Sequence, residues 1–252
     1  MAEAVKAEQS LPTKPDYGLD APMVVRSMFS RGGWTLAVAL AVYFVNRSQY
    51  PDVAARILAV LGAFALIFFA VGGFMFWSSR VAKLQLRDQL VDSLALQADA
   101  KVLDVGCGRG LMAIAAAKRL KSGKVTGIDT WSPRDLSGNS AEAVKQNAKL
   151  EGVADRVRVE TCDARKLPYP DNQYDAVISS LAIHNIPESD GRKQAIREMF
   201  RVLKPGGRML IFDLFYTGAY AKVLQEAGAG DVQLSGFKFL WCVPSRSLTA
   251  RK

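Results

Sequence analysis

The stretch that decides the fold reads Val102-Leu103-Asp104-Val105-Gly106-Cys107-Gly108-Arg109-Gly110, and Leu111-Met112-Ala113-Ile114-Ala115-Ala116-Ala117 follows it. Its apolar beginning predicts a buried β-strand, and the alanine-rich run predicts a helix. The glycines between them allow a sharp reversal, and they let backbone N–H groups approach a ligand that a Cβ atom would hold away. The pattern therefore predicts a strand–turn–helix unit that binds a nucleotide-type cofactor.

The spacing of these glycines narrows the choice of cofactor. A dinucleotide-binding turn has the pattern G-x-G-x-x-G, which would place its third glycine at position 111. Leu111 occupies that position, and the glycine comes one residue earlier, at Gly110. The spacing therefore disfavours a nicotinamide dinucleotide.

Strands and helices alternate along the rest of the chain. After a lead-in helix near residues 81–94, apolar strands are predicted near 101–105, 124–128, 157–161, 174–179 and 208–213. Two later runs, 232–240 and 241–249, have no helix between them and predict an antiparallel pair. This alternation predicts an α/β fold with a doubly wound parallel sheet, whose ligand lies at the carboxyl ends of the strands.

Five motifs in order resemble the class I S-adenosylmethionine-dependent methyltransferases, over roughly residues 84–252. They are the glycine turn, a strand ending in Asp129, a strand ending in Asp163-Ala164, the run Leu167-Pro168-Tyr169-Pro170-Asp171-Asn172-Gln173-Tyr174-Asp175, and Leu203-Lys204-Pro205-Gly206-Gly207. The fourth motif is similar to one in the subgroup of ubiquinone and menaquinone C-methyltransferases. The resemblance implies a Rossmann-like seven-stranded sheet of order 3-2-1-4-5-7-6, with its last strand antiparallel, and S-adenosylmethionine as cofactor.

The resemblance also implies a set of cofactor-binding residues. Gly106, Gly108 and Gly110 would pass under the methionine part, Asp129 would hold the ribose hydroxyls, and Asp163 with the amide of Ala164 would read adenine. Their motif neighbours complete the predicted set: Asp104, Cys107, Thr130, Trp131, Cys162 and Ser180. Two of these have structural alternatives. Asp104 either lies near the cofactor ammonium or only braces the loop, and Trp131 either packs on adenine or caps the core.

The segment after the fourth strand bears on the methyl acceptor. Methyltransferases that act on nucleobase or glutamine nitrogen carry Asn/Asp-Pro-Pro-Tyr here, whereas this chain has Ser180-Leu181-Ala182-Ile183. His184 follows at once and is the single histidine of the chain. It is either a general base for a hydroxyl, thiol or activated carbon, or a brace for the loop. Asp213, which ends the fifth strand, is the second catalytic candidate.

The first eighty residues predict a membrane anchor. No charge interrupts residues 57–79, which is enough for the ~20 residues that cross a hydrocarbon core. Residues 33–46 are also apolar, and we interpret the two segments as a transmembrane helical hairpin. The predicted organisation is a mobile tail at 1–32, a hairpin at 33–79 and a methyltransferase domain at 80–252. A buried helix of a soluble core is seldom so long and charge-free, and a cleaved signal peptide would export a domain whose cofactor is made in the cytosol.

Flanking charges predict how the hairpin is oriented. Five basic residues lie at the end shared by the tail and the catalytic domain, and two lie near the turn: Arg26, Arg31, Arg80, Lys83 and Arg87 against Arg47 and Arg56. The positive-inside rule then predicts two spans with the catalytic domain in the cytoplasm. Alanines at four-residue spacing, at 37 and 41 and at 55, 59 and 63, would let the two arms approach closely, and the same helices offer a route to a homo-oligomer.

Composition excludes several other functions. The net charge is +9, but the basic residues are scattered among acids, so we expect no nucleic-acid partner and relate the charge to anionic lipid. Cys107, Cys162 and Cys242 have no C-x-x-C spacing and suit a reducing compartment. With one histidine, a His/Cys metal cluster is not predicted.

The sequence therefore predicts a membrane-anchored methyltransferase that acts on O, S or activated C of a small lipophilic acceptor taken from the bilayer. The loop 130–139 is longer than such a connection needs, and it would form a lid or part of the acceptor pocket. The alternative is a protein methyltransferase acting on a membrane partner. The third hypothesis is a cofactor-binding scaffold without turnover.

Overall fold

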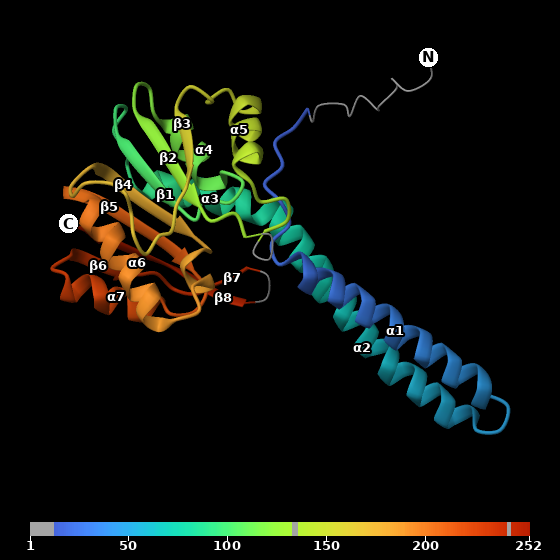
Figure 1. Cartoon of the computed structure of the whole chain (residues 1–252). Helices are drawn as coiled ribbons and strands as arrows, with labels where there is room; N and C mark the ends of the chain where they lie inside the picture. The colour runs from blue at the N-terminus through green and yellow to red at the C-terminus, as the bar shows by residue number, and fades with distance from the viewer. Residues whose placement is uncertain (1–12, 133–135, 241–242) are drawn as a thin grey trace, which may run out of the picture.

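The computed structural model describes residues 13–132, 136–240 and 243–252. It consists of an α/β domain and a long helical hairpin that projects away from it (Figure 1). The hairpin is formed by α1 (Pro22–Asn46) and α2 (Pro51–Trp77). Each begins with proline in its first turn, where the missing N–H group costs no helical hydrogen bond.

The first helix is longer than the sequence predicted. It begins at Pro22, so the boundary of the mobile tail at residue 32 is wrong. The prediction followed the apolar run and treated Arg26 and Arg31 as lying outside the helix. A charged side chain does not end a helix, because arginine is among the better helix formers.

Small residues bring the two helices together, but they are not the alanines predicted. Gly32 lies against Phe69, where an added Cβ would come within 2.9 Å of the ring, and Gly72 lies against Met28 and Phe29. Ala39, Ala54 and Ala65 are buried between the helices. The predicted alanines at 37, 41, 55, 59 and 63 are exposed. The small residues at the contact are seven positions apart in each helix, Gly32 and Ala39 in α1 and Ala65 and Gly72 in α2. Seven-residue spacing is typical of two helices that cross with a left-handed twist.

The large apolar side chains of the hairpin point outward. Exposed ones include Trp34, Phe44, Val45, Val60, Phe64, Leu66 and Ile67. Both helices are long and apolar enough to cross a membrane, and only 11% of the most apolar window of each is buried. They are therefore not core helices of the α/β domain.

The domain is built on one eight-stranded sheet, with seven strands in the order β3-β2-β1-β4-β5-β8-β6 and β7 paired with β8. The strands are β1 (Lys101–Val105), β2 (Lys124–Asp129), β3 (Val157–Thr161), β4 (Tyr174–Ser180), β5 (Leu203–Asp213), β6 (Gly230–Leu234), β7 (Lys238–Leu240) and β8 (Val243–Arg251). Strands β1 to β5 are parallel, and β8 is antiparallel to β5. The predicted order of the main strands is confirmed, and the added feature is β7, which splits off where the sequence predicted one strand at 232–240.

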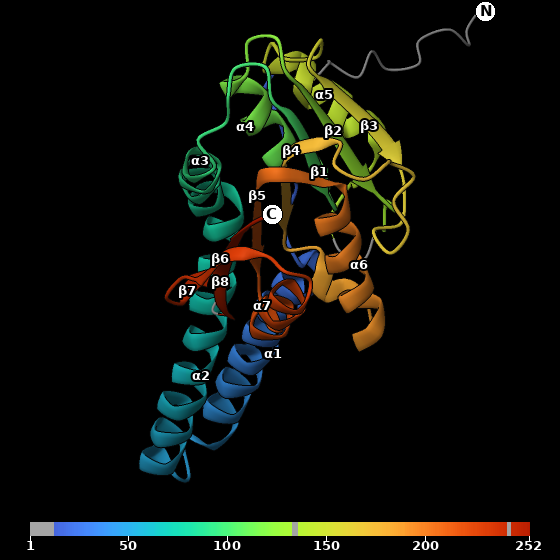
Figure 2. The same cartoon turned by 90° about the vertical axis from the view of Figure 1, so that its left-hand side faces the viewer.

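Helices cover both faces of the sheet (Figures 1 and 2). One face packs against α3 (Lys83–Ser93), α4 (Leu111–Arg119) and α5 (Ala141–Leu150), and the other against α6 (Ser189–Val202) and α7 (Thr217–Glu226). A π-helical turn, η1 (Ser78–Ala82), joins α2 to α3 without a break. The second arm of the hairpin therefore continues directly into the catalytic domain.

Candidate functional site

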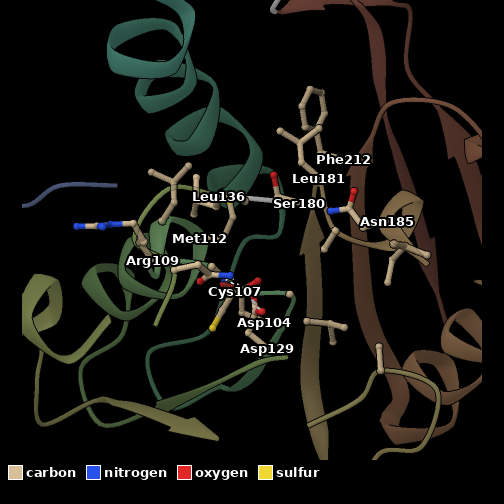
Figure 3. Close-up of a pocket in the computed structure, with 18 of the residues that line it drawn as sticks. Asp104, Cys107, Arg109, Met112, Asp129, Leu136, Ser180, Leu181, Asn185 and Phe212 are labelled. Carbon is tan, nitrogen blue, oxygen red and sulfur yellow. Dashed lines mark hydrogen bonds between the residues drawn. The ribbon is translucent and has the colours of Figure 1, made fainter. Parts of the chain in front are cut away.

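A cavity of about 410 Å³ lies at the carboxyl ends of β1, β2 and β4, within the size range of cofactor and ligand pockets. Figure 3 shows two different walls. Asp104, Cys107 and Asp129 lie on one side, and Leu181 and Phe212 lie on the other. The cavity thus has a polar end on the glycine turn and an apolar end beyond β4.

The glycine turn, residues 106–110, has the conformation that the sequence requires. Gly106, Gly108 and Gly110 have φ angles of 72°, 56° and 85°, in the left-handed region that favours glycine. A Cβ atom on Gly106 would collide with the side chain of Ala182. Gly106 and Gly108 line the cavity, whereas Gly110 does not. Gly110 instead begins α4, where an added Cβ would lie 2.8 Å from Val144.

Asp104 is a buried carboxylate at the floor of the cavity. It is 1% exposed, neither of its carboxylate oxygens has a partner in hydrogen-bond geometry among the described residues, and the backbone N–H of Ala113 is the donor that opposes the effect of burial on its pKa. Burial raises its pKa to about 7. A buried polar group without a partner is costly, and this one faces a cavity that would admit a cationic group. The arrangement fits a ligand ammonium such as that of the methionine part of S-adenosylmethionine.

Asp129 holds the two loops around the cavity. Its carboxylate accepts hydrogen bonds from the backbone N–H of Gly108 (2.8 Å) and of Trp131 (2.7 Å). Asn139 donates a third, longer one at 3.4 Å. A carboxylate has about four lone-pair positions, so Asp129 retains acceptor capacity on its cavity side. It can therefore fix the glycine turn and still accept from a ribose hydroxyl.

Replacing Asp129 should weaken cofactor binding. For Asp129→Ala we expect S-adenosylmethionine affinity to fall by about 2–4 kcal/mol, because hydrogen bonds to a charged group and the order of the glycine turn are lost together. Isothermal titration calorimetry measures this directly. Asp171→Ala, which removes an exposed carboxylate outside the cavity, is the matched control. Unchanged affinity in a folded Asp129→Ala protein would contradict the assignment.

The predicted adenine end is only partly assembled in the cavity wall. Thr130, Cys162, Asp163, Ala164 and Ser180 line the cavity. The Asp163 carboxylate is paired with Arg165 at 2.6 Å, and this pairing lowers its pKa. Asp163 would thus have to bind adenine with its carboxylate already partnered.

Trp131 lies outside the lining of the cavity. Its indole N–H donates to the hydroxyl of Thr161 at the end of β3, at 2.8 Å. Of the two roles that the sequence left open, this contact corresponds to capping of the strand end.

His184 and Asp213 form a pair beside the apolar end. Asp213 is completely buried, and it accepts from the backbone N–H of His184 at 3.1 Å and lies 2.5 Å from the ring Nδ1. The turn that carries His184, η2 (Ile183–Asn185), places Ile183 and Asn185 in the cavity lining, but His184 itself does not line it. Because a carboxylate only accepts, the pairing fixes the ring proton on Nδ1 and leaves Nε2 as the acceptor.

A segment before the hairpin closes one side of the cavity, and the sequence analysis missed it. This segment, residues 16–20, is called the N-terminal strap. Tyr17 and Asp20 line the cavity together with Lys83 of α3. The Tyr17 hydroxyl donates to Glu151 at 2.9 Å, and the Lys83 ammonium donates to the carbonyls of Tyr17 and Gly18 and to Asp20, each at 3.0 Å.

Side chains of the catalytic domain also hold Asp16. Its carbonyl accepts from Arg109 at 2.6 Å and from Asn147 at 2.8 Å. In Figure 3 the Arg109 side chain points away from the cavity carboxylates. Only Tyr17, an aromatic residue within a polar segment, signalled this docking in the sequence, and the prediction of a mobile tail is wrong for the strap. Pro133, Arg134 and Asp135 of the predicted lid loop, and Cys242, lie outside the described residues.

Comparison with known proteins finds methyltransferases among the relatives of this chain. Residues 102–207 match a family model described as a methyltransferase domain. The chain is 34% identical over 168 residues to 27-O-demethylrifamycin SV methyltransferase of Amycolatopsis mediterranei, covering 62% of this chain and 58% of that protein. It is 32% identical over 151 residues to the ubiquinone/menaquinone biosynthesis C-methyltransferase UbiE of Geotalea daltonii, covering 56% and 60% respectively.

A solved structure supports the fold. Geranyl diphosphate methyltransferase in complex with SAM superposes with a TM-score of 0.53 at 15% identity, covering 67% of this chain and 84% of that one. Residues 102–207 thus match a methyltransferase domain, and the cavity beside them fits S-adenosylmethionine as cofactor. The chain spans between 39% and 60% of the length of these and other curated relatives that it matches.

Proposed function

We propose that the whole protein is a membrane-anchored methyltransferase that transfers a methyl group from S-adenosylmethionine to O, S or activated C of a small lipophilic acceptor. The observation that carries the proposal is one cavity with a polar end on the glycine turn and an apolar end next to a helical hairpin. When bound, S-adenosylmethionine supplies an electrophilic methyl group. The residues of the chain bind the cofactor and the acceptor, orient them toward each other and exclude water from the cavity.

The polar end of the cavity fits the cofactor. Asp104 would face its ammonium group, the backbone of Gly106 and Gly108 would pass along its methionine part, and Asp129 would accept from the ribose. Cys107 also lines this wall, and burial raises the pKa of its thiol. We therefore assign it a packing role rather than a nucleophilic one.

The opposite end fits an apolar acceptor. Leu181 and Phe212 lie there beside Ser180 and Asn185 (Figure 3), and Leu86, Ile183 and Ile186 add apolar surface to the cavity lining. Apolar walls bind lipophilic groups by excluding water and offer few hydrogen bonds to a peptide backbone or a charged side chain. This lining favours a small lipophilic molecule over a protein segment as acceptor.

His184 is the proposed general base. In the sequence His184 lies between Ile183 and Asn185, which both line the cavity, and the contact with Asp213 holds its ring through Nδ1. Nε2 would take the proton of the acceptor as the methyl group is transferred. Asp213 orients the ring and is a positioning residue, since it contacts His184 and lies outside the cavity lining.

The docked strap supports a two-span topology. Residues 16–20 are bound to the catalytic domain immediately before α1, and α2 continues into the same domain through η1. Both ends of the hairpin are therefore on one side, so the chain crosses a bilayer either twice or not at all. The exposed apolar side chains of α1 and α2 favour two crossings. The excess of arginine and lysine at the domain end favours a cytoplasmic catalytic domain.

This topology can be tested by cysteine labelling. In a full-length Cys162→Ser, Cys242→Ser background, we expect Gln49→Cys in the α1–α2 turn to react with a membrane-impermeant thiol reagent on intact cells. Thr13→Cys, just before the strap, should react only after permeabilisation. Labelling of Thr13→Cys on intact cells, or equal labelling at both positions, would contradict the two-span hairpin.

The reaction is tested by turnover. The protein in membranes would be incubated with methyl-labelled S-adenosylmethionine and, in parallel, with extracted lipids, quinones, small thiols and membrane proteins. Label in an organic-extractable product supports the proposal, and label in protein supports a protein methyltransferase. Cofactor binding without transfer to any of these classes would favour the non-catalytic scaffold.

A further inference from the structure

Four exposed aromatic residues lie on the side of the catalytic domain that faces the hairpin. They are Phe215 and Tyr216, after β5, and Phe237 and Phe239, beside β7, and they are called the aromatic patch. Phe237 and Phe239 are 62% and 66% exposed, and Phe215 is 56% exposed. Large aromatic side chains are usually buried in the core or at an interface, and a cluster of rings this exposed indicates a contact surface.

Basic side chains connect the members of this patch. Arg246 stacks over the ring of Phe237 at 4.9 Å and donates to the hydroxyl of Thr217, next to Tyr216, at 2.9 Å. Arg192 lies 4.0 Å over the ring of Tyr216. Lys238 lies between Phe237 and Phe239 in the sequence. The patch therefore combines exposed rings with fixed positive charge.

The patch extends from the foot of the hairpin to the mouth of the cavity. Phe239 and Lys238 line a shallow groove together with Ala82 of η1 and Leu86 of α3, and in both views β7 lies beside the helix that enters the domain (Figures 1 and 2). At the other end, the Arg192 that covers Tyr216 donates to the carbonyl of Ile186, a cavity residue, at 2.7 Å.

The end of the patch nearest the hairpin lies at the height of the headgroup layer of a membrane. Phe76 and Trp77 end the apolar part of α2 with about half of each side chain exposed, and Arg80 lies over the ring of Phe76. Aromatic residues of this kind mark the membrane–water interface. The groove that Phe239 lines begins at Ala82, five residues beyond Trp77 and a rise of about 7 Å along a helix, and it extends along α3 to Gln89. Its near end therefore lies at the level of the headgroup region, which is roughly 5–8 Å thick on each side of the hydrocarbon core.

We propose that the aromatic patch is a second membrane-contact surface, which inserts its rings into the headgroup layer of an anionic bilayer leaflet and holds the cavity mouth on the membrane. The rings would enter the interface while Lys238, Arg192 and Arg246 pair with lipid phosphates. A lipophilic acceptor could then pass from the bilayer to the cavity without crossing water. The inference rests on the proposed membrane hairpin.

Fluorescence quenching by lipid tests this contact in the full-length chain. Gly236 precedes Phe237, and an added Cβ there would meet nothing within 4 Å. In the Cys162→Ser, Cys242→Ser background, Gly236→Cys would carry an environment-sensitive fluorophore. The protein would be reconstituted into phosphatidylcholine–phosphatidylserine vesicles containing a lipid with a nitroxide near its headgroup, which reports position 236, or in parallel samples a lipid with a nitroxide near the end of its acyl chain, which reports position 64.

Two further positions give the reference values. Phe64→Cys, on the exposed surface of α2, reports insertion of the hairpin, and Lys121→Cys, at the amino-terminal end of β2 opposite the cavity, reports the water-facing side. We expect lipid quenching of the fluorophore at position 236 to be well above that at position 121. It should be lost in the Phe237→Ser, Phe239→Ser variant and decrease without phosphatidylserine or at high salt. Quenching at Phe64→Cys should not change in that variant.

Each other outcome has a definite meaning. Quenching at 64 but not at 236 would overturn the second contact and leave the hairpin standing. No quenching at 64 or at 236 would overturn the membrane anchor and the patch together. A label at 236 that is shielded without lipid quenching, in a protein that measures as a dimer, would show that a second copy covers the patch and would also overturn the proposal.

Discussion

His184→Ala should lower turnover by roughly 10²–10⁴-fold while leaving the dissociation constant of S-adenosylmethionine nearly unchanged. The reason is that a general base acts on the acceptor, and removal of such a base typically costs this factor. The ring does not line the polar end of the cavity, so the cofactor site should remain intact. Methyl transfer to the acceptor found in the labelled-methyl assay, together with calorimetry for the cofactor, measures both quantities.

A matched variant distinguishes a general-base role of His184 from a role in holding the loop. In His184→Asn, the side-chain amide can donate to Asp213 from about the position of Nδ1 and so keep the contact that anchors η2. It cannot take up a proton. Under the proposal, His184→Asn is as slow as His184→Ala. If His184 only braces the loop, His184→Asn restores turnover, and His184→Ala shows a lower melting temperature as its main defect.

The parallel sheet and the cofactor edge could be predicted because their signals are local. The glycine turn requires left-handed backbone at residues 106, 108 and 110, and this requirement is visible in the residue types. Apolar strands that end in Asp104, Asp129 and Asp213 meet at one edge whenever a sheet is parallel. The order of the main strands followed from the resemblance and not from pattern, because strand pairing is a long-range property.

Contacts between distant segments could not be predicted from local patterns. The strap contains Gly18 and two aspartates and follows Pro15, a composition that is typical of mobile termini. It is ordered by partners more than sixty residues away, among them Lys83 and Asn147. The small residues between α1 and α2 were also misassigned. Alanine is so frequent in both helices that a four-residue pattern arises by chance, and only the packing of glycine against Phe69 distinguishes the true face.

Asp104 should make the protein without cofactor less stable as pH rises, and this effect is the second largest that we expect. Its pKa is about 7 in the folded chain against 3.8 without burial. Between these values the unfolded chain loses the proton first, so ionisation opposes folding. One pKa unit is worth about 1.4 kcal/mol. The free energy of unfolding of the cofactor-free protein should therefore be lower by on the order of 4 kcal/mol at pH 8 than below about pH 4.

Cofactor binding has the opposite dependence on the same carboxylate. Under the proposal the ammonium of S-adenosylmethionine would pair with the ionised carboxylate, so wild-type affinity should rise with pH up to about 7 and then level off. Below that pH it should fall by about tenfold per unit. Asp104→Asn removes the titration, and with it a charged hydrogen bond worth about 1.5–3 kcal/mol. Its affinity should therefore be lower at pH 8 and independent of pH.

The two readouts together test the assignment of Asp104. Calorimetry across pH 5–8 gives the affinities, and thermal melting in detergent without cofactor gives the stabilities, in both cases as the difference between wild type and variant. We expect Asp104→Asn to melt above the wild type at pH 8 and to bind S-adenosylmethionine more weakly. Asp99→Asn, on the exposed loop before β1, is the control that should change neither. A lower melting temperature for Asp104→Asn with unchanged affinity would mean that Asp104 only braces the loop, because a carboxylate kept for its ligand weakens the empty protein.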